Sequence, residues 1–217
     1  IQPIAVGLAL ILGLLNIFGA KKSGALQVFL VIGLLVLLAM FIGGGLPEVN
    51  IANFRSMFDV ESSSLLATAG LVYISYVGVT NVASLSEEVR DPERNLPLGV
   101  FLALGTAIVV YALGTITMVG LVPPEQLAGD LTPVATAAHV RFGEIGSLLM
   151  SIAALLAFTS VANAGTLSAS RYPLAMSRDH LAPRFFQRIS KRGTPFYAIL
   201  FSVGTIVAII ILLDPTK

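Results

Sequence analysis

The chain has 217 residues, of which 56% are hydrophobic and 12% charged, and its formal net charge is +1. Soluble domains carry about 25% charged residues. Here the apolar residues also fall in long blocks, which excludes an ordinary soluble domain and indicates a polytopic membrane protein. The chain has no cysteine, and its two histidines, His139 and His180, lie far apart, so we expect no disulfide, no metal centre and no cofactor.

Six stretches are long and apolar enough to cross a hydrocarbon core, which takes about 20 residues of helix. They are residues 1–20, 24–45, 63–86, 97–122, 143–171 and 195–213. We therefore expect an all-α polytopic membrane protein with six spans and no separate soluble domain. Because the chain begins without Met and stops directly after an apolar block, we also expect it to be a piece of a longer protein.

The basic residues predict how these spans are oriented. Ten of the 13 Lys and Arg residues lie in or beside the loops that follow the first, third and fifth predicted spans. The other three, Arg55, Arg141 and Lys217, lie on the opposite side. Short loops rich in Lys and Arg stay in the cytoplasm, so we expect the first set of loops to be cytoplasmic in a multi-pass protein of the plasma membrane.

Two connecting segments carry local signals. Residues 184–192, RFFQRISKR, mix basic and aromatic side chains as nucleic-acid-binding segments do. Their place between two spans favours instead a topology determinant that contacts anionic lipids, with no nucleic acid. On the side of the membrane opposite to the cytoplasm, Thr132 is a predicted helix N-cap and Pro133 occupies the first helical position. This pair predicts a short surface helix within residues 131–143, which is either a lid or a plain connector.

The third predicted span contains polar and flexible residues where a lipid-facing helix should be apolar. They are Tyr73, Ser75, Tyr76, Gly78, Thr80, Asn81 and Ser84. Gly costs a helix interior about 1 kcal/mol relative to Ala, and non-helical backbone persists at membrane depth only where protein or a water-filled cavity satisfies it. We therefore predict a break within residues 75–79 that offers backbone groups to a polar solute. The alternative is an unbroken packing helix in which Gly78 admits a neighbour.

The fifth predicted span carries a polar stripe. Thr159, Asn163, Thr166 and Ser170 recur at helical spacing along one face, and Gly165 leaves space beside them. Small residues, among them Ser160, form a second face suited to close helix contact. Two polar spans without a charge in the membrane favour a site for a zwitterion or another solute held by backbone and hydroxyl groups. The alternative is a pair of tightly packed helices.

Two sets of residues resemble the amino acid permeases of the amino acid–polyamine–organocation superfamily. Tyr73-Ile74-Ser75-Tyr76-Val77-Gly78, followed by the charged loop at residues 86–97, is similar to the sixth span of that family and the loop after it. Asn163-Ala164-Gly165, followed by residues 170–183 and Thr194-Pro195, is similar to its eighth span and the loop into the ninth. Asn16, Gly19 and Gln27 are similar to the weaker pattern between its fourth and fifth spans. The resemblance covers nearly the whole chain, which would supply spans four to nine.

The resemblance implies part of a broken-helix transporter fold with two inverted repeats of five helices and a binding site at the membrane midplane. It implies that Ile74, Ser75 and Val77 present main-chain carbonyls to an ammonium group, and that Gly78 lets the backbone open. Gly165 stands where many relatives have a bulky residue, which implies either a roomier pocket or one filled by residues from elsewhere. The predicted substrate-binding residues are Tyr73, Ile74, Ser75, Tyr76, Val77, Gly78, Asn163 and Gly165.

The function that the resemblance implies is secondary active transport of amino acids or related amines by alternating access. The coupling ion would be a proton or sodium, or the protein would exchange substrates. Some relatives use a Lys in their fifth span as a proton-linked switch, but residues 24–45 contain no Lys. Thr159 and Ser160, together with the family's first span, are a possible sodium site instead. The alternative is that this hydroxyl pair has a structural role in a packed helix.

We also expect an inner gate, in which Glu87 or Glu88 pairs with Arg171 or a nearby base at the cytoplasmic face. The alternative is a set of separate, solvated charges. A non-transporting amino acid sensor of the same fold is the alternative function. An intramembrane enzyme is a weaker alternative, because no Asp, Glu, His or Cys lies in the core of a predicted span to supply a nucleophile, a base or metal ligands.

Overall fold

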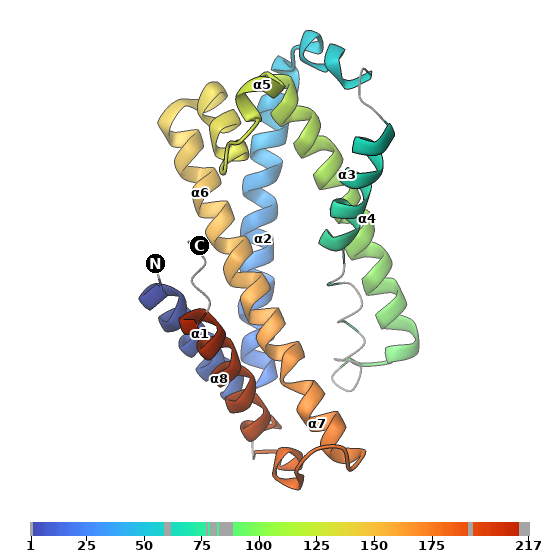
Figure 1. Ribbon diagram of the computed structural model, residues 1–217, viewed down its shortest axis with the longest axis vertical. Helices are drawn as coiled ribbons and strands as arrows, with labels where there is room; N and C mark the ends of the chain where they lie inside the picture. Colours follow the sequence, from blue (N-terminus) through green and yellow to red (C-terminus); the bar gives the residue numbers. More distant parts are fainter. Residues whose placement is uncertain are drawn as a thin grey trace. The chain divides into compact units, whose positions relative to one another are not determined.

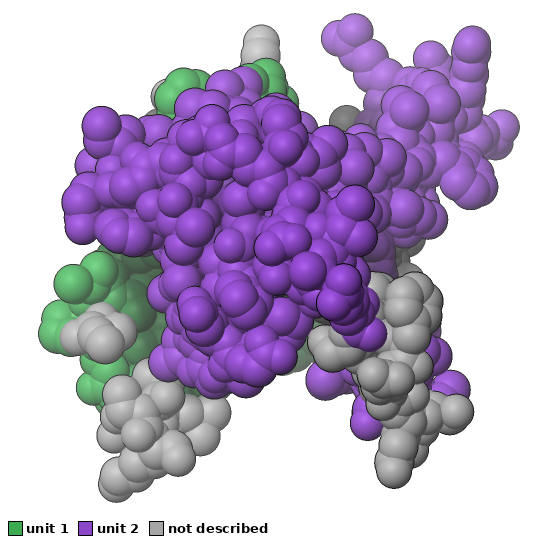
Figure 2. Space-filling model, turned by 90° about the horizontal axis from the view of Figure 1, so that it is seen from above, with its two compact units in different colours: residues 1–32, 156–217 green, residues 33–155 purple. Residues whose placement is uncertain are grey.

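The computed structural model describes residues 2–58, 62–76, 78, 82, 89–190 and 193–212. Helices are the only regular structure in these ranges, so the all-α expectation is confirmed for the part described. The chain divides into two compact units, coloured separately in Figure 2. Unit 1 comprises residues 1–32 and 156–217, and unit 2 comprises residues 33–155. The helices α2 (Ala20–Gly45) and α6 (Pro133–Ala169) contribute residues to both units.

Among the described residues, three helical stretches are long and apolar enough to cross a membrane. They are Ser23–Glu48, Pro92–Leu121 and Pro133–Arg178, with mean hydropathies of 2.9, 2.2 and 2.0. Large apolar side chains lie exposed along them, such as Phe101 at 71% and Leu102 at 63%, which suits contact with hydrocarbon far better than contact with water. Shorter apolar helices cover Gln2–Ile17, Ser64–Ile74 and Phe196–Leu212. They are below the length of about 20 residues that a span requires, and the division into six spans therefore stays a prediction.

In unit 1, α1 (Gln2–Ile17) and α8 (Phe196–Leu212) lie side by side (Figure 1). Gly13 permits this close approach, because a Cβ atom there would meet the side chain of Val203. Gly19, with φ at 130°, separates α1 from α2 in a conformation that suits Gly and strains other residues. The result is a corner between two apolar helices at Ile17–Ala20.

The segment between α6 and α8 also packs within unit 1. It contains α7 (Arg171–Arg178) and the short 3-10 helix η4 (Arg184–Gln187), which contact each other and α8. Phe186 is buried, with its ring centroid 5.4 Å from that of Phe201 in α8. Thr194 is fully buried and donates from its hydroxyl to the carbonyl of Ile17 at 3.2 Å, which ties the start of α8 to the end of α1.

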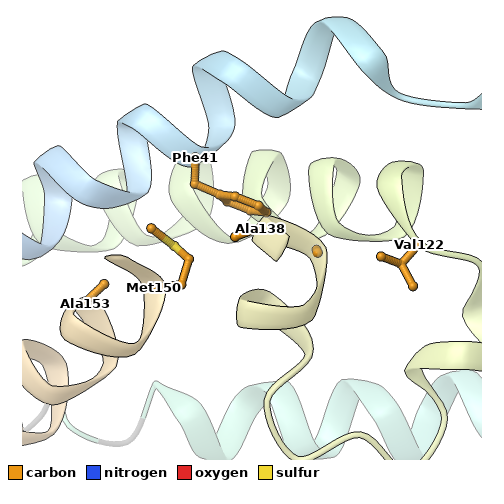
Figure 3. Packing of buried hydrophobic residues seen from close by; sticks show 6 residues of the cluster. Phe41, Val122, Ala138, Met150 and Ala153 are labelled. Atoms are coloured by element: carbon orange, nitrogen blue, oxygen red, sulfur yellow. The ribbon is translucent and has the colours of Figure 1, made fainter. Parts of the chain in front are cut away.

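Unit 2 has a hydrophobic core that joins α2, the end of α4 (Pro92–Leu121) and α6 (Figure 3). The buried residues are Phe41, Val122, Ala137, Ala138, Met150 and Ala153. Figure 3 shows the ring of Phe41 extending from α2 toward Ala138, with Met150 and Ala153 on the later part of α6. The long apolar helices of this unit are thus held together by packed apolar side chains.

A glycine divides α6 into two helical parts. Gly143 has φ 65° and ψ −152°, which is not a helical conformation, so residues 133–142 form a separate short helix. Three residues later, a Cβ atom on Gly146 would collide with the carbonyl oxygen of Ala138. The two parts therefore pack closely after the kink. The short helix expected within residues 131–143 is confirmed, and its fully buried residues Ala137 and Ala138 make it part of the core.

Side chains from the short helix before Gly143 and from η2 (Ile51–Phe58) satisfy carbonyl groups at the ends of α2 and α4. Arg141 donates from Nε to the carbonyl of Gly44 at 3.0 Å, and its Nη2 atom lies 3.1 Å from Oε1 of Glu48 in the 3-10 helix η1 (Leu46–Glu48). Asn53, in η2 (Ile51–Phe58), donates from Nδ2 to the carbonyls of Val119 at 3.0 Å and Gly120 at 3.1 Å. The last carbonyls of a helix have no partner within it and carry its negative dipole end, so these donors stabilise both helix ends.

The start of α6 is held by Asp130, which follows the short helix α5 (Pro124–Leu127). The Oδ1 atom of Asp130 accepts from the amide of Thr132 at 2.7 Å, and its Oδ2 atom accepts from the hydroxyl of Thr136 at 2.6 Å. These bonds, the one from the Thr136 hydroxyl above all, hold the pKa of Asp130 below its ordinary value of 3.8. Hydrogen bonds to the ionised carboxylate favour that form, so Asp130 stabilises the helix start as an anion.

Candidate functional site

The helix α3 (Ser62–Ser75) ends at the first residue of the range in which a break is predicted. The amide of Tyr76 donates to the carbonyl of Tyr73 at 3.0 Å, a spacing of three residues that tightens the last turn. The part of the chain that the structure describes between there and residue 89 is limited to Gly78 and Val82. The helix α3 thus ends within the range predicted for the break. Val77 and the residues predicted to form a second half-helix lie outside the described residues, so the division into two half-helices stays a prediction.

The residues around this helix end are open. Tyr73 and Ile74 are 75% and 64% exposed, and a Cβ atom on Gly78 would meet no atom within 4 Å. A helix C-terminus presents unpaired carbonyl groups and a partial negative charge. The end of α3 can therefore receive a cationic group such as an ammonium through its backbone.

Tyr76 connects this helix end to α4. Its ring centroid lies 5.9 Å from that of Tyr111 at an interplanar angle of 67°, an edge-to-face pair. Tyr111 also lines a cavity of about 200 Å³ in unit 2. The lining residues come from α2, α4 and the short helix before Gly143, and they are Leu38, Phe41, Val110, Tyr111, Gly114, Thr115, Met118 and Val134.

A second cluster of polar side chains lies in unit 1 around Asn163, which is 1% exposed. The Oδ1 atom of Asn163 accepts from Nδ2 of Asn16 at 3.3 Å and from the hydroxyl of Ser23 at 3.1 Å. Its Nδ2 atom donates to Oε1 of Gln27 at 3.1 Å and to the carbonyl of Ser23 at 3.4 Å. A carboxamide accepts two hydrogen bonds and donates two, so the protein itself fills every hydrogen-bonding position of Asn163.

The same cluster includes Ser160, which is 6% exposed. Its hydroxyl oxygen accepts a hydrogen bond of 2.6 Å from Nε2 of Gln27. Ser160 and Asn163 are three residues apart on one face of α6, and Ser23 and Gln27 are four apart on α2, so each pair projects from one side of its helix. The amide side chains thereby join α6 to the corner between α1 and α2.

A family model described as amino acid permease matches residues 3–214 of the chain. The chain belongs to the amino acid permease family. This confirms the resemblance that its motifs indicate and makes the chain part of a membrane protein. The family match identifies the permease, and the structure shows where the described residues of its motifs lie.

The permease has relatives in plants, bacteria and archaea. It is 31% identical to the vacuolar cationic amino acid transporter 4 of Arabidopsis thaliana, over 96% of this chain and 36% of the relative. It is 32% identical to an uncharacterized transporter of Mycobacterium tuberculosis, over 95% of this chain and 48% of the relative. An uncharacterized protein of Methanocaldococcus jannaschii is 26% identical, over 94% and 48%. The chain thus spans between about a third and a half of the length of these curated relatives.

The predicted site residues of the permease fall into two groups. Asn163 and Ser160 lie in the buried amide cluster, with Thr159 half-buried beside it. Gly165 is exposed, and a Cβ atom there would meet no atom within 4 Å. Two residues of helix turn by about 200°, so Asn163 and Gly165 point to opposite sides of α6. The structure therefore does not bring these two residues to one surface.

The predicted inner gate is described in part. Arg171 is half-buried at the start of α7, next to the end of α6. Glu87 and Glu88, its predicted partners, lie outside the described residues. The ion pair stays a prediction.

Sequence reasoning missed Ser23 as a member of the amide cluster. The available signal was the four-residue spacing of Ser23 and Gln27 at the start of an apolar span, matched by the spacing of Ser160 and Asn163 on another. Two polar pairs at helical spacing favour a shared helix interface. Which helices meet there depends on contacts between residues more than 130 positions apart.

Proposed function

We propose that the whole protein of which this chain is a part is a secondary active transporter of amino acids or related amines. The observation that carries the proposal is the end of α3 at Ser75, inside an apolar segment of a permease-family chain. A backbone that leaves its helix at membrane depth needs polar partners. An amino acid that binds there supplies an ammonium group for carbonyls and a carboxylate for amides.

In this proposal the main-chain carbonyls of Ile74, Ser75 and Val77 bind the substrate ammonium, and the rings of Tyr73 and Tyr76 flank it. Gly78 leaves room for the opened backbone, which the open space around it supports. Gly165, which is exposed on α6, remains a proposed substrate contact. Asn163 reaches a substrate only if it gives up partners in the amide cluster, so its contribution requires a different conformation of α6.

The fold of two inverted repeats of five helices supplies the motion, by exposing the midplane site first to one side and then to the other. A pair between Arg171 and Glu87 or Glu88 would close the inner side. The coupling ion is a proton or sodium, or the protein exchanges substrates. A sodium ion on Thr159 and Ser160 would compete with Nε2 of Gln27 for the Ser160 hydroxyl oxygen.

The proposed setting is the plasma membrane, with six spans at residues 1–20, 24–45, 63–86, 97–122, 143–171 and 195–213. The loops after the first, third and fifth spans are cytoplasmic, and their basic residues contact anionic lipids. Three exposed basic residues support this contact: Arg178 at the end of α7, and Arg184 and Arg188 between α7 and α8. We propose no enzymatic activity, cofactor or nucleic-acid partner.

The experiment uses the purified full-length protein in proteoliposomes with a panel of radiolabelled amino acids, in which proton and sodium gradients are imposed separately. We expect uptake of at least one amino acid above that of empty liposomes, with saturation and competition by unlabelled substrate. The name of the Arabidopsis relative makes arginine and lysine members of the panel. Binding of an amino acid without uptake under every gradient and in exchange would indicate the sensor function instead.

A further inference from the structure

We propose that the segment from η4 to the start of α8 is a docking surface for anionic phospholipid, in which two arginines bind the headgroup and three aromatic rings enter the membrane interface. The residues of this aromatic–basic surface are Arg184, Phe185, Arg188, Phe196 and Tyr197. The inference rests on the proposed function, in which this loop contacts lipid, and it names the surface, its chemistry and the lipid class. All five residues belong to unit 1.

Three aromatic rings form the apolar part of the surface. The ring centroid of Tyr197 lies 5.9 Å from that of Phe185 and 5.5 Å from that of Phe196, and both pairs are edge-to-face. The three residues are between 37% and 45% exposed. Phe196 and Tyr197 are the first two residues of α8, which contains no charged residue. Aromatic rings at the start of an apolar helix are typical of the level at which hydrocarbon meets the polar headgroups.

Two arginines form the charged part of the surface. Arg184 directly precedes Phe185, and the amide of Arg188 donates to the carbonyl of Phe185 at 3.3 Å. Both arginines are exposed, and no carboxylate in the part of the chain that the structure describes forms an ion pair with either of them. A guanidinium is always charged and binds two phosphate oxygens at once. The anion at the depth of the aromatic rings is the phosphate of a phospholipid.

The fold holds this surface in place before a lipid binds. Phe186 is buried, and its ring centroid lies 5.4 Å from that of Phe201. The hydroxyl of Ser177 donates to the carbonyl of Pro183 at 2.8 Å, and Nε2 of Gln187 donates to the carbonyl of Ser177. These contacts join η4 to α7 and α8. Because the backbone between the arginines is already ordered, little conformational entropy is lost when a headgroup binds.

The charge of the segment selects the lipid class. Residues 171–193 contain six Lys and Arg residues and one acid, Asp179. Each Lys or Arg near an anionic membrane surface strengthens the attraction about fivefold. In phosphatidylcholine the phosphate charge is balanced by the lipid's own amine, whereas phosphatidylglycerol keeps a net negative charge. The surface therefore prefers phosphatidylglycerol to phosphatidylcholine.

Tryptophan fluorescence tests this preference in the full-length protein reconstituted in lipid vesicles. The chain has no Trp, so Phe185→Trp provides a local reporter once any Trp elsewhere in the protein is replaced. Brominated lipids quench Trp on contact, and brominated phosphatidylglycerol is compared with brominated phosphatidylcholine. We expect the relative binding constant at this reporter to favour phosphatidylglycerol at least about fivefold. Adding Arg184→Gln and Arg188→Gln should lower that ratio about fivefold, with an unchanged size-exclusion profile.

Ile108→Trp is the matched control reporter. Ile108 is 52% exposed on α4, and no charged residue lies between Arg94 and Leu121. Its fluorescence should therefore be quenched by both lipids without a preference. This control separates binding at the aromatic–basic surface from a general enrichment of anionic lipid around the protein.

Each of four results would overturn the inference. Absence of quenching at Phe185→Trp by both lipids would mean that another part of the protein covers the surface. Equal quenching by the two lipids would remove the selection of anionic lipid. An unchanged ratio in the arginine variant would remove the headgroup contact, and an equal preference at Ile108→Trp would show that the effect is not local. Uptake is measured separately, so transport without a lipid preference contradicts this inference alone, and a lipid preference without uptake contradicts only the proposed transport.

Discussion

Asn163 joins α6 to the corner between α1 and α2 through one carboxamide with four hydrogen bonds. In the membrane such a group cannot exchange a lost partner for water, so each bond matters to the geometry of the helices it connects. The saturation of Asn163 also explains why a polar stripe on an apolar span is not in itself a ligand site. Its residues can be used entirely by neighbouring helices.

Asn163→Ala should destabilise the protein, because hydrogen-bonding groups of Ser23 and Gln27 inside the protein would lose their partner. Each such group costs about 1–3 kcal/mol when it is left without a partner. We expect the free energy of unfolding of the full-length protein to fall by about 2–4 kcal/mol, measured by denaturant unfolding in detergent. Gly165→Ala, on the opposite face of α6 with open space around it, is the control and should change little. Equal stabilities of the two variants would refute the structural role of the cluster.

Asp130 predicts a pH dependence of stability. Its pKa is lowered in the folded protein from the ordinary value of 3.8 by the hydroxyl of Thr136 and the amide of Thr132. A carboxyl group with a depressed pKa contributes stability that is fully present above 3.8 and is lost as the pH falls through the folded value. The stability difference between the native protein and Asp130→Asn should therefore be constant near neutral pH and shrink below pH 3.8.

Thermal unfolding from pH 7 to pH 3 measures this dependence. Glu125→Gln, which removes one exposed carboxylate from α5, controls for the loss of a charge. If Asp130→Asn and Glu125→Gln followed the same pH course, the hydrogen bonds to Asp130 would have no linked effect on stability.

At the scale of elements, the kink in α6 depends on Gly143. Gly adopts its φ of 65° and ψ of −152° without strain. Any other residue in this backbone conformation is strained by about 1–3 kcal/mol. Gly143→Ala should lower the free energy of unfolding by about that amount. Gly99→Ala, in the helical interior of α4 with open space at its Cβ position, should be neutral or slightly stabilising. A Gly143→Ala protein as stable as Gly99→Ala would mean that the short helix is not held in this conformation.

The end of α3 predicts the effect of a second glycine. Gly78→Leu should abolish amino acid binding by filling the space that the opened backbone needs. Folding should be retained, because the Cβ position meets no atom within 4 Å in the part of the chain described. Gly70→Leu, also with open space but inside α3, is the control. The measurement is the Kd of the full-length protein for its substrate together with its size-exclusion profile, and retained binding by Gly78→Leu would contradict the site.

At the scale of the whole molecule, the distribution of basic residues predicts the orientation in the membrane. The chain has no cysteine, so a single engineered one reports its own side of the membrane if the rest of the protein is made cysteine-free. Arg55 and Arg188 are both exposed and lie on opposite predicted sides. We expect a membrane-impermeant thiol reagent to modify Arg55→Cys in intact cells and Arg188→Cys only after permeabilisation. Modification of position 188 from outside would reverse the predicted topology.

Properties that depend on local sequence were predictable from this chain. Hydropathy indicated the apolar helices, Thr132 and Pro133 indicated the start of α6, and Gly78 with its polar neighbours indicated the end of α3 at Ser75. Each of these follows from side-chain chemistry within a few residues, because a helix forms or ends by local propensity and by the solvent that its surface meets. The family was likewise visible in motifs that lie close together along the chain.

Contacts between distant residues were decided by the tertiary structure. The polar stripe on α6 was compatible with a ligand site and with a packed helix, and only the approach of Asn16, Ser23 and Gln27 directs it to packing. Similarly, no feature of Tyr111 in the sequence connects it with Tyr76 or with a cavity. The reason is physical: periodicity states which residues share a face of a helix, but which partner covers that face depends on how helices far apart in the chain pack together.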